Sequence, residues 1–126
     1  MKAAYVDTSC FVAIALGESG VASVTRRLAA FDALYSANLL EAELYSALHR
    51  ERIPPDNRAL DRIAWVTPDR PLHAEIERVL TAGYVRGADC WHLASALYLA
   101  KEPGDISFLT LDARQSSVAR KLGFQE

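Results

Sequence analysis

Four acidic residues, Asp7, Glu43, Asp89 and Asp112, each lie at a boundary between apolar and polar sequence. Carboxylate oxygens are the ligands that hard cations such as Mg²⁺ and Mn²⁺ prefer. Several carboxylates held together without a cation would repel one another strongly. A bound divalent ion relieves that repulsion, and it can activate a water and stabilise the transition state of phosphodiester hydrolysis. The four acids therefore predict a metal-dependent hydrolytic site, provided that the fold brings them together.

Asp7 and Asp112 each follow directly on a short apolar segment that is typical of a β-strand. In sheets of parallel strands, ligands bind beyond the carboxyl ends of the strands, so both acids are expected at that edge. For either acid alone the alternative is a cap on the next helix, because Asp is common at helix N-termini. Thr8 or Ser9 can also cap the first helix, which would leave the Asp7 carboxylate free for a cation.

Glu43 lies on the apolar face of a predicted helix over residues 37–52. At ~100° per residue it falls between Leu39 and Ala47, inside a stripe of leucine and alanine side chains. A carboxylate on such a face is costly unless it is paired or coordinated. A structural ion pair with an arginine is the alternative to a metal ligand.

Asp89 is near the start of the most apolar predicted helix, residues 88–102, where an N-cap is again the alternative. His92 lies three residues later and therefore shares a face of the helix with Asp89. We expect His92 to support the site by packing or hydrogen bonding rather than by binding the metal.

The spacing of apolar residues and helix breakers predicts the elements that must position these acids. Strands are expected over residues 3–6, 33–36 and 106–111, with a turn or edge strand over 66–69. Helices are expected over residues 9–16, 19–31, 37–52, 56–65, 71–83, 88–102 and 112–124. Short strands separated by helices favour an α/β fold with a parallel sheet and helices on both faces. No linker divides the chain, so we expect a single domain over residues 1–126.

The composition suits a globular domain, since 51% of the 126 residues are hydrophobic and the net charge is −2. No apolar run approaches the ~18 residues of a membrane span, and no signal-peptide pattern is present. We therefore expect a cytoplasmic protein. Cys10 and Cys90 lie in apolar patterns, which predicts buried thiols rather than a zinc site. A nucleic-acid partner would need local positive charge, for which Arg86 and Arg114 are the basic residues nearest the acids.

Four segments carry the acids in their order along the chain: YVDTSCFVA, EAELYSALHR, GADCWHLASALYLA and FLTLDARQSSVARKLGF. Over residues 3–124 they resemble the acidic motifs of the PIN-domain ribonucleases, and most closely those of the small VapC-type toxins of toxin–antitoxin pairs. The resemblance implies a PIN-like α/β/α sandwich and a Mg²⁺- or Mn²⁺-dependent endoribonuclease that acts on RNA. It also implies a cognate antitoxin that holds the enzyme inactive, and a homodimer.

The resemblance makes Asp7, Glu43, Asp89 and Asp112 the catalytic, metal-binding quartet. Ser9 and Thr110 match the hydroxyls two residues after the first acid and two residues before the last. In our working hypothesis Asp7 and Asp89 hold one ion, whereas Glu43 and Asp112 complete its outer shell, orient the attacking water or help to bind a second ion.

The chain departs from the family pattern at two places. Leu111 stands where the family often has Asn, and Ala37 falls near the place of a common serine, with Ser36 one residue earlier. Asp105 is a rival for the fourth acid, but it precedes its predicted strand and should lie at the opposite end from the site.

Two other functions fit parts of the sequence. A phosphatase of the aspartyl-phosphate kind would use Asp7 as nucleophile, but such sites usually have a second acid where Ser9 stands. A catalytically weak protein-interaction module would use an apolar surface formed by FDALYSANLL and the first two helices, since exposed apolar patches often mark interaction sites. That module would cleave no RNA with Mn²⁺, and it leaves the four acids unexplained.

Overall fold

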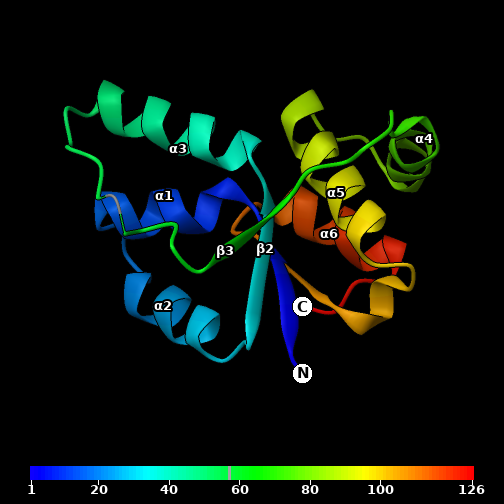
Figure 1. Ribbon diagram of the computed structural model, residues 1–126, viewed down its shortest axis with the longest axis horizontal. Coiled ribbons are helices and arrows are strands. Elements are labelled where there is room, and N and C mark those ends of the chain that lie inside the picture. Colours follow the sequence, from blue (N-terminus) through cyan, green and yellow to red (C-terminus); the bar gives the residue numbers. More distant parts are fainter. Residues whose placement is uncertain (57) are drawn as a thin grey trace.

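A parallel β-sheet lies between two layers of helices in the computed structural model, which describes residues 1–56 and 58–126 (Figure 1). The strands are β1 (Ala3–Val6), β2 (Ala33–Ala37), β3 (Ile63–Val66) and β4 (Ser107–Leu109). The helices are α1 (Thr8–Leu16), α2 (Val21–Ala29), α3 (Leu39–Arg50), α4 (His73–Ala82), α5 (Gly87–Leu99) and α6 (Ala113–Leu122), and a 3₁₀ helix (Pro103–Asp105) precedes β4. The predicted α/β/α class is confirmed.

The order of the strands in the sheet is β3-β2-β1-β4, and every neighbouring pair is parallel. Tyr5 of β1 lies opposite Tyr35 of β2 and Phe108 of β4, so β1 is an inner strand. Because the strands are parallel, their carboxyl ends meet at one edge of the sheet. At that edge the backbone N–H of Asp7 donates to the carbonyl of Leu109, the last residue of β4, over 3.0 Å.

The sheet separates two apolar cores. Successive residues of β1 point to opposite faces. Ala4 and Val6 belong to the core that includes residues of α1, α2 and α3. Tyr5 belongs to the core that includes residues of α4, α5 and α6, and Figure 1 shows the two groups of helices on either side of the sheet. Helices on both faces explain why the strands are apolar runs without alternation.

Helices α1 and α6 each end at a glycine. Gly17 follows α1 with φ of 65°, and Gly123 follows α6 with φ of 105°. Both values lie in the left-handed region, which glycine enters without a Cβ clash. In both cases the chain turns back over the end of the helix, and the backbone N–H of the glycine satisfies carbonyls of the last turn.

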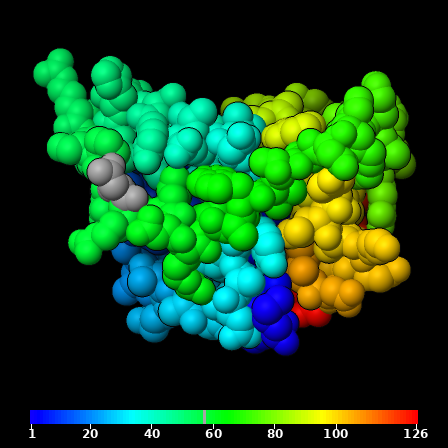
Figure 2. Space-filling view, viewed as in Figure 1, coloured from blue at the N-terminus to red at the C-terminus, as the bar shows by residue number. Residues whose placement is uncertain are grey.

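The helix predicted over residues 56–65 is wrong. Residues 58–62 form turns, Ile63–Val66 form the edge strand β3, and Asn57 lies outside the described residues. Ile63 and Val66 pair with Leu34 and Ala37 of β2, so pairing with a distant strand prevails over local helical spacing. The predicted turn or edge strand at 66–69 overlaps β3 only at Val66. In the space-filling view, residues 58–66 (green) lie across the front of the molecule (Figure 2).

The apolar partner surface expected over FDALYSANLL is not exposed. Phe31, Leu34, Ala37 and Leu40 are all buried, because β2 is an inner strand between β1 and β3. Cys10 and Cys90 are buried free thiols, as predicted, and burial raises the pKa of Cys10 to about 12. Within residues 1–56 and 58–126, none of the helices has the length and apolar character needed to cross a membrane.

Candidate active site at the carboxyl edge of the sheet

A pocket of about 310 Å³ lies where β1 leads into α1 and where α3, α5 and α6 come together. Its lining is Asp7, Thr8, Ser9, Val12, Glu43, Ala47, Arg50, Arg86, Asp89, His92 and Asp112. The structure thus brings together the four predicted acids with Ser9, His92 and Arg86. Thr110 and Arg114 are not part of the lining, but Thr110 contacts Asp7 through a hydrogen bond.

Asp7 is the most buried of the four acids, with 4% of its surface exposed. Its Oδ1 accepts hydrogen bonds from the backbone N–H and the hydroxyl of Ser9, at 3.1 and 2.6 Å. Its Oδ2 accepts one from the Thr110 hydroxyl at 2.8 Å. Asp7 itself therefore caps α1, and the expectation that Thr8 or Ser9 would do so is wrong. Burial raises the pKa of Asp7, although the two hydroxyls act in the opposite direction.

The hydroxyls of Ser9 and Thr110 link the turn that carries Asp7 to the turn that carries Asp112 through hydrogen bonds. The Ser9 hydroxyl accepts from the backbone N–H of Leu111 at 2.9 Å while it donates to Asp7. The Thr110 oxygen accepts from the backbone N–H of Asp112 at 3.0 Å. Leu111, which replaces the asparagine common in the family, therefore contributes through its backbone, while its side chain is exposed.

Asp112 caps α6, since its Oδ1 accepts from the backbone N–H of Gln115 at 2.8 Å. Asp89 does not cap α5: the N-cap position is Arg86, and Asp89 lies in the first turn. Arg86 Nε is 4.0 Å from Asp89 Oδ2. Burial raises the pKa of Asp89, and the negative charge of Asp112 raises it further, with a smaller contribution from Glu43. These carboxylates are therefore close enough to repel one another.

Glu43 is held by two donors to the same oxygen. The Thr8 hydroxyl donates to its Oε1 at 2.7 Å, and His92 Nε2 lies 2.8 Å from that atom. The hydrogen bond from His92 is the main reason why the pKa of Glu43 is lowered. The partner of Glu43 is thus a histidine, not the arginine of the alternative interpretation. The other carboxylate oxygen, Oε2, has no hydrogen-bond donor within the described part of the chain.

The Glu43 carboxylate and the Tyr5 hydroxyl together define the tautomer of a neutral His92 ring, because a carboxylate can only accept a hydrogen bond. The Tyr5 oxygen accepts from the backbone N–H of Ala37 at 3.0 Å and lies 2.8 Å from His92 Nδ1. Burial raises the pKa of Tyr5, so the phenol keeps its proton and donates it to Nδ1. His92 then carries its own proton on Nε2 and donates it to Glu43. We expected His92 in a supporting role but missed Tyr5, although a tyrosine in a buried strand needs a partner for its hydroxyl.

The donor set fits a hard divalent cation. It consists of carboxylate and hydroxyl oxygens, which Mg²⁺ and Mn²⁺ prefer. Over the residues that the structure describes, no three His, Cys, Asp or Glu side chains form a ready-made metal cage. Mg²⁺ does not require one, because proteins usually bind it through one or two carboxylates, with waters and substrate phosphates as the other ligands.

Comparison with known families gives one match that covers nearly all of these elements. A family model described as the PIN domain matches residues 4–121. The match includes the four acids and the residues that hold them. Neither the curated proteins nor the solved structures that were compared with the chain gave a match.

Proposed function

Because the chain belongs to the PIN-domain family, we propose that it is an endoribonuclease that hydrolyses RNA with Mg²⁺ or Mn²⁺ at its four acids. Membership of this family supports a metal-dependent nuclease in general. The observation that carries the proposal is the meeting of Asp7, Glu43, Asp89 and Asp112 in one pocket. The charge of Asp112 raises the pKa of Asp89, and a cation between them would relieve that repulsion.

Asp7 and Asp89 are the proposed ligands of the ion. Asp7 Oδ2 accepts one hydrogen bond, from Thr110, and keeps a lone pair. Within the described residues, the one basic side chain paired with the Asp89 carboxylate is the exposed Arg86, whose Nε lies 4.0 Å away. When bound there, a divalent ion would lower the pKa of a water and offset the charge that develops on the phosphate. Rigid support of Asp7 by Ser9 and Thr110 keeps its carboxylate in a fixed position for that role.

Glu43 and Asp112 are proposed to orient the attacking water. Glu43 is anchored through Oε1, which leaves Oε2 to accept a hydrogen bond. Asp112 is anchored through Oδ1, its acceptor for Gln115, which leaves Oδ2 for the same purpose. Arg86 has 82% of its side chain exposed at this pocket, so it is the better placed of the two predicted arginines to contact an RNA phosphate.

Asp7 is poorly suited to be the nucleophile of an aspartyl-phosphate enzyme. Three hydrogen bonds engage its two oxygens, and only 4% of the residue is exposed. Phosphatase assays with small phosphate esters test that alternative directly.

We further propose that the protein is the VapC-type toxin of a toxin–antitoxin pair, with a homodimer as its working form. The proposal rests on the resemblance of the four motifs. An apolar groove of about 390 Å³ lies between α1, α3 and the segment after α3. A helical segment of an antitoxin could cover this surface. Its apolar lining includes Phe11, Ile14, Leu44, Leu48 and Ile53.

The experiment compares RNA cleavage by the wild type with cleavage by Asp7→Asn and Asp105→Asn. Asp105 is an exposed acid at the opposite end of β4, so it is a matched control for the loss of one carboxylate. We expect cleavage that requires Mg²⁺ or Mn²⁺, is lost in Asp7→Asn and is retained in Asp105→Asn. Full metal-dependent activity in Asp7→Asn would contradict the proposed site.

A further inference from the structure

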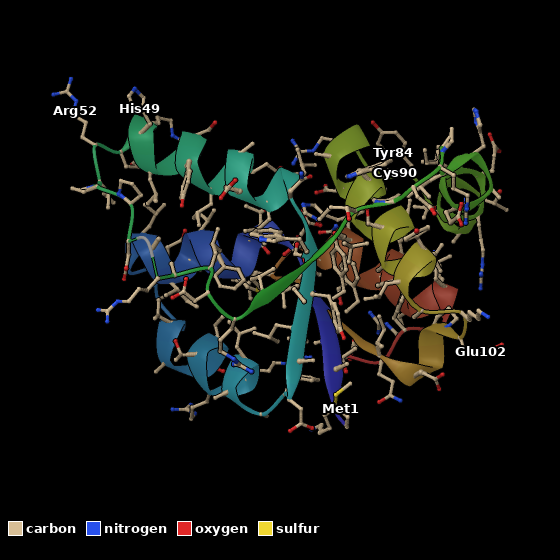
Figure 3. All side chains as sticks on the ribbon, in the orientation of Figure 1. Met1, His49, Arg52, Tyr84, Cys90 and Glu102 are labelled. Atoms are coloured by element: carbon tan, nitrogen blue, oxygen red, sulfur yellow. The ribbon has the colours of Figure 1, made fainter. Side chains whose placement is uncertain are left out.

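Tyr84 is an exposed aromatic residue on a well-anchored segment between α4 and α5. It has 67% of its surface exposed, whereas the next residue, Val85, is 3% exposed. A Cβ on the preceding residue, Gly83, would lie 2.9 Å from Val118 Cγ2 of α6. The backbone on both sides of Tyr84 is thus packed against the body of the protein, and its ring is presented to solvent near the start of α5 (Figure 3).

Arg114 provides a cation beside this ring. Its guanidinium carbon lies 6.0 Å from the centre of the Tyr84 ring, within the range of a cation–π interaction. Arg114 lies in the first turn of α6. The contact therefore joins the α4–α5 connection to α6 and orients the aromatic ring, while much of the ring surface remains open.

The Tyr84–Arg114 pair lies beside the acidic pocket, outside its lining. Arg86 and Asp112 both line that pocket. Arg86 is two residues from Tyr84, and Asp112 is two residues from Arg114. Two residues of fully extended chain span at most about 7 Å. The surface beside the pocket therefore combines an aromatic face with the positive charges of Arg86 and Arg114.

We propose that Tyr84, oriented by Arg114, is a stacking subsite for one unpaired base of a single-stranded RNA beside the cleaved phosphate. The inference rests on the proposed ribonuclease function. Unpaired bases stack on exposed aromatic rings and on arginine planes, whereas neighbouring arginines attract the phosphates. Bases of a duplex are already stacked within the helix, so this subsite would favour unpaired RNA. It would tolerate different bases, because every base has a π-face.

The test measures RNA binding in an Asp7→Asn background, which prevents cleavage. The probes are a short single-stranded RNA of randomised sequence that carries 2-aminopurine, and an RNA duplex of the same length. Tyr84→Ala and Tyr84→Trp are compared with Tyr45→Ala, which removes another exposed tyrosine from α3, outside the acidic pocket. Thermal unfolding checks that each variant is folded.

We expect Tyr84→Ala to weaken binding of the single strand about tenfold and to abolish the quenching of 2-aminopurine fluorescence. Tyr84→Trp should retain both the affinity for the single strand and the quenching. Tyr45→Ala should change neither. Arg114→Gln should reduce the slope of log affinity against log salt concentration by about 0.7, the share of one phosphate contact in a single strand. Tyr84→Ala should leave that slope unchanged.

The outcomes separate this subsite from the proposed function. If wild type cleaves RNA but Tyr84→Ala binds the single strand as well as Tyr45→Ala does, the subsite is wrong and the nuclease stands. Equal weakening of duplex and single strand by Tyr84→Ala also overturns stacking. If Asp7→Asn binds neither probe and wild type cleaves no RNA, both the subsite and the proposed function are wrong.

Discussion

The hydroxyl of Tyr5 lies 2.8 Å from Nδ1 of His92, although the two residues are 87 positions apart in the sequence. The contact connects an inner strand of the sheet to α5. Because Nε2 of the same ring lies 2.8 Å from Glu43, it also connects the buried core to the acidic pocket. The position of Glu43 thus depends on a tyrosine that does not line the pocket.

Tyr5→Phe tests this dependence. The substitution leaves His92 Nδ1 and the buried N–H of Ala37 without the phenol, so we expect a loss of about 1–3 kcal/mol of stability. It also removes the group that holds Nδ1, so the ring of His92 can change position against Glu43, and kcat should fall more than KM rises. Urea unfolding, cleavage kinetics and the ¹⁵N chemical shifts of His92 measure these effects.

Tyr35→Phe on the neighbouring strand is the matched control for Tyr5→Phe, since Tyr35 lies directly opposite Tyr5 in the sheet. The wild type and Tyr35→Phe should show the proton of His92 on Nε2. A His92 in Tyr5→Phe with unchanged shifts, together with unchanged kcat, would contradict the positioning role.

Asp7→Asn should make the metal-free protein more stable at neutral pH. The pKa of Asp7 is raised in the folded state, mainly by burial, so the folded protein binds a proton more tightly than the unfolded chain. The contribution of Asp7 therefore favours folding at low pH, and stability is lost as the pH rises from about 4 through the raised pKa. Asn cannot ionise, yet it can still accept from the Ser9 N–H. We expect the unfolding midpoint to rise by a few degrees.

Thermal unfolding across this pH range, with metal removed by a chelator, measures the effect of Asp7→Asn. The advantage of the variant should disappear toward low pH, because wild-type Asp7 is then protonated. A variant that is less stable than the wild type at neutral pH would show that the buried charge is already compensated within the protein.

Added Mg²⁺ or Mn²⁺ should stabilise the wild type against heat, because an ion that binds only the folded protein shifts the equilibrium toward it. Since the pKa of Asp89 is raised by burial and by Asp112, protons compete with the ion at a higher pH than for an ordinary aspartate. The stabilisation should therefore shrink as the pH falls, and it should do so at a higher pH than expected for an ordinary aspartate, whose pKa is about 4. Asp89→Asn should abolish the stabilisation by the metal ion, and Asp105→Asn should retain it. Stabilisation that does not change with pH would show that the ion binds elsewhere.

Gly83→Ala should destabilise the protein by about 1–3 kcal/mol, because its Cβ would lie 2.9 Å from Val118 Cγ2. A second substitution, Val118→Ala, removes that atom and should recover part of the loss. Denaturant unfolding of both single variants and the double variant gives the coupling energy. Strictly additive losses would show that Gly83 is not confined by Val118.

The positions of Asp7 and Asp112 could be predicted from the sequence because each follows an apolar strand, and parallel strands end at one edge. Periodicity also identified Glu43 as unusual. Its partner could not be predicted, because His92 on α5 and Glu43 on α3 belong to the two opposite helix layers and meet only at the carboxyl edge of the sheet. The strand β3 was missed for a similar reason. Leu60 and Ile63 have a spacing of three, which suits a helix, and only the pairing of Ile63 with Leu34 of β2 decides between the two structures.

The most direct test of the proposed site is the rate of RNA cleavage as Mg²⁺ or Mn²⁺ is added to the wild type, Asp89→Asn and Asp105→Asn. The wild type and Asp105→Asn should cleave RNA in proportion to occupancy of the metal site, and a chelator should stop them. Asp89→Asn should show at least about a hundredfold lower rate, as expected when a transition-state charge contact is lost. Wild-type rates in Asp89→Asn, or cleavage that persists with the chelator, would contradict a metal-dependent ribonuclease site at the four acids.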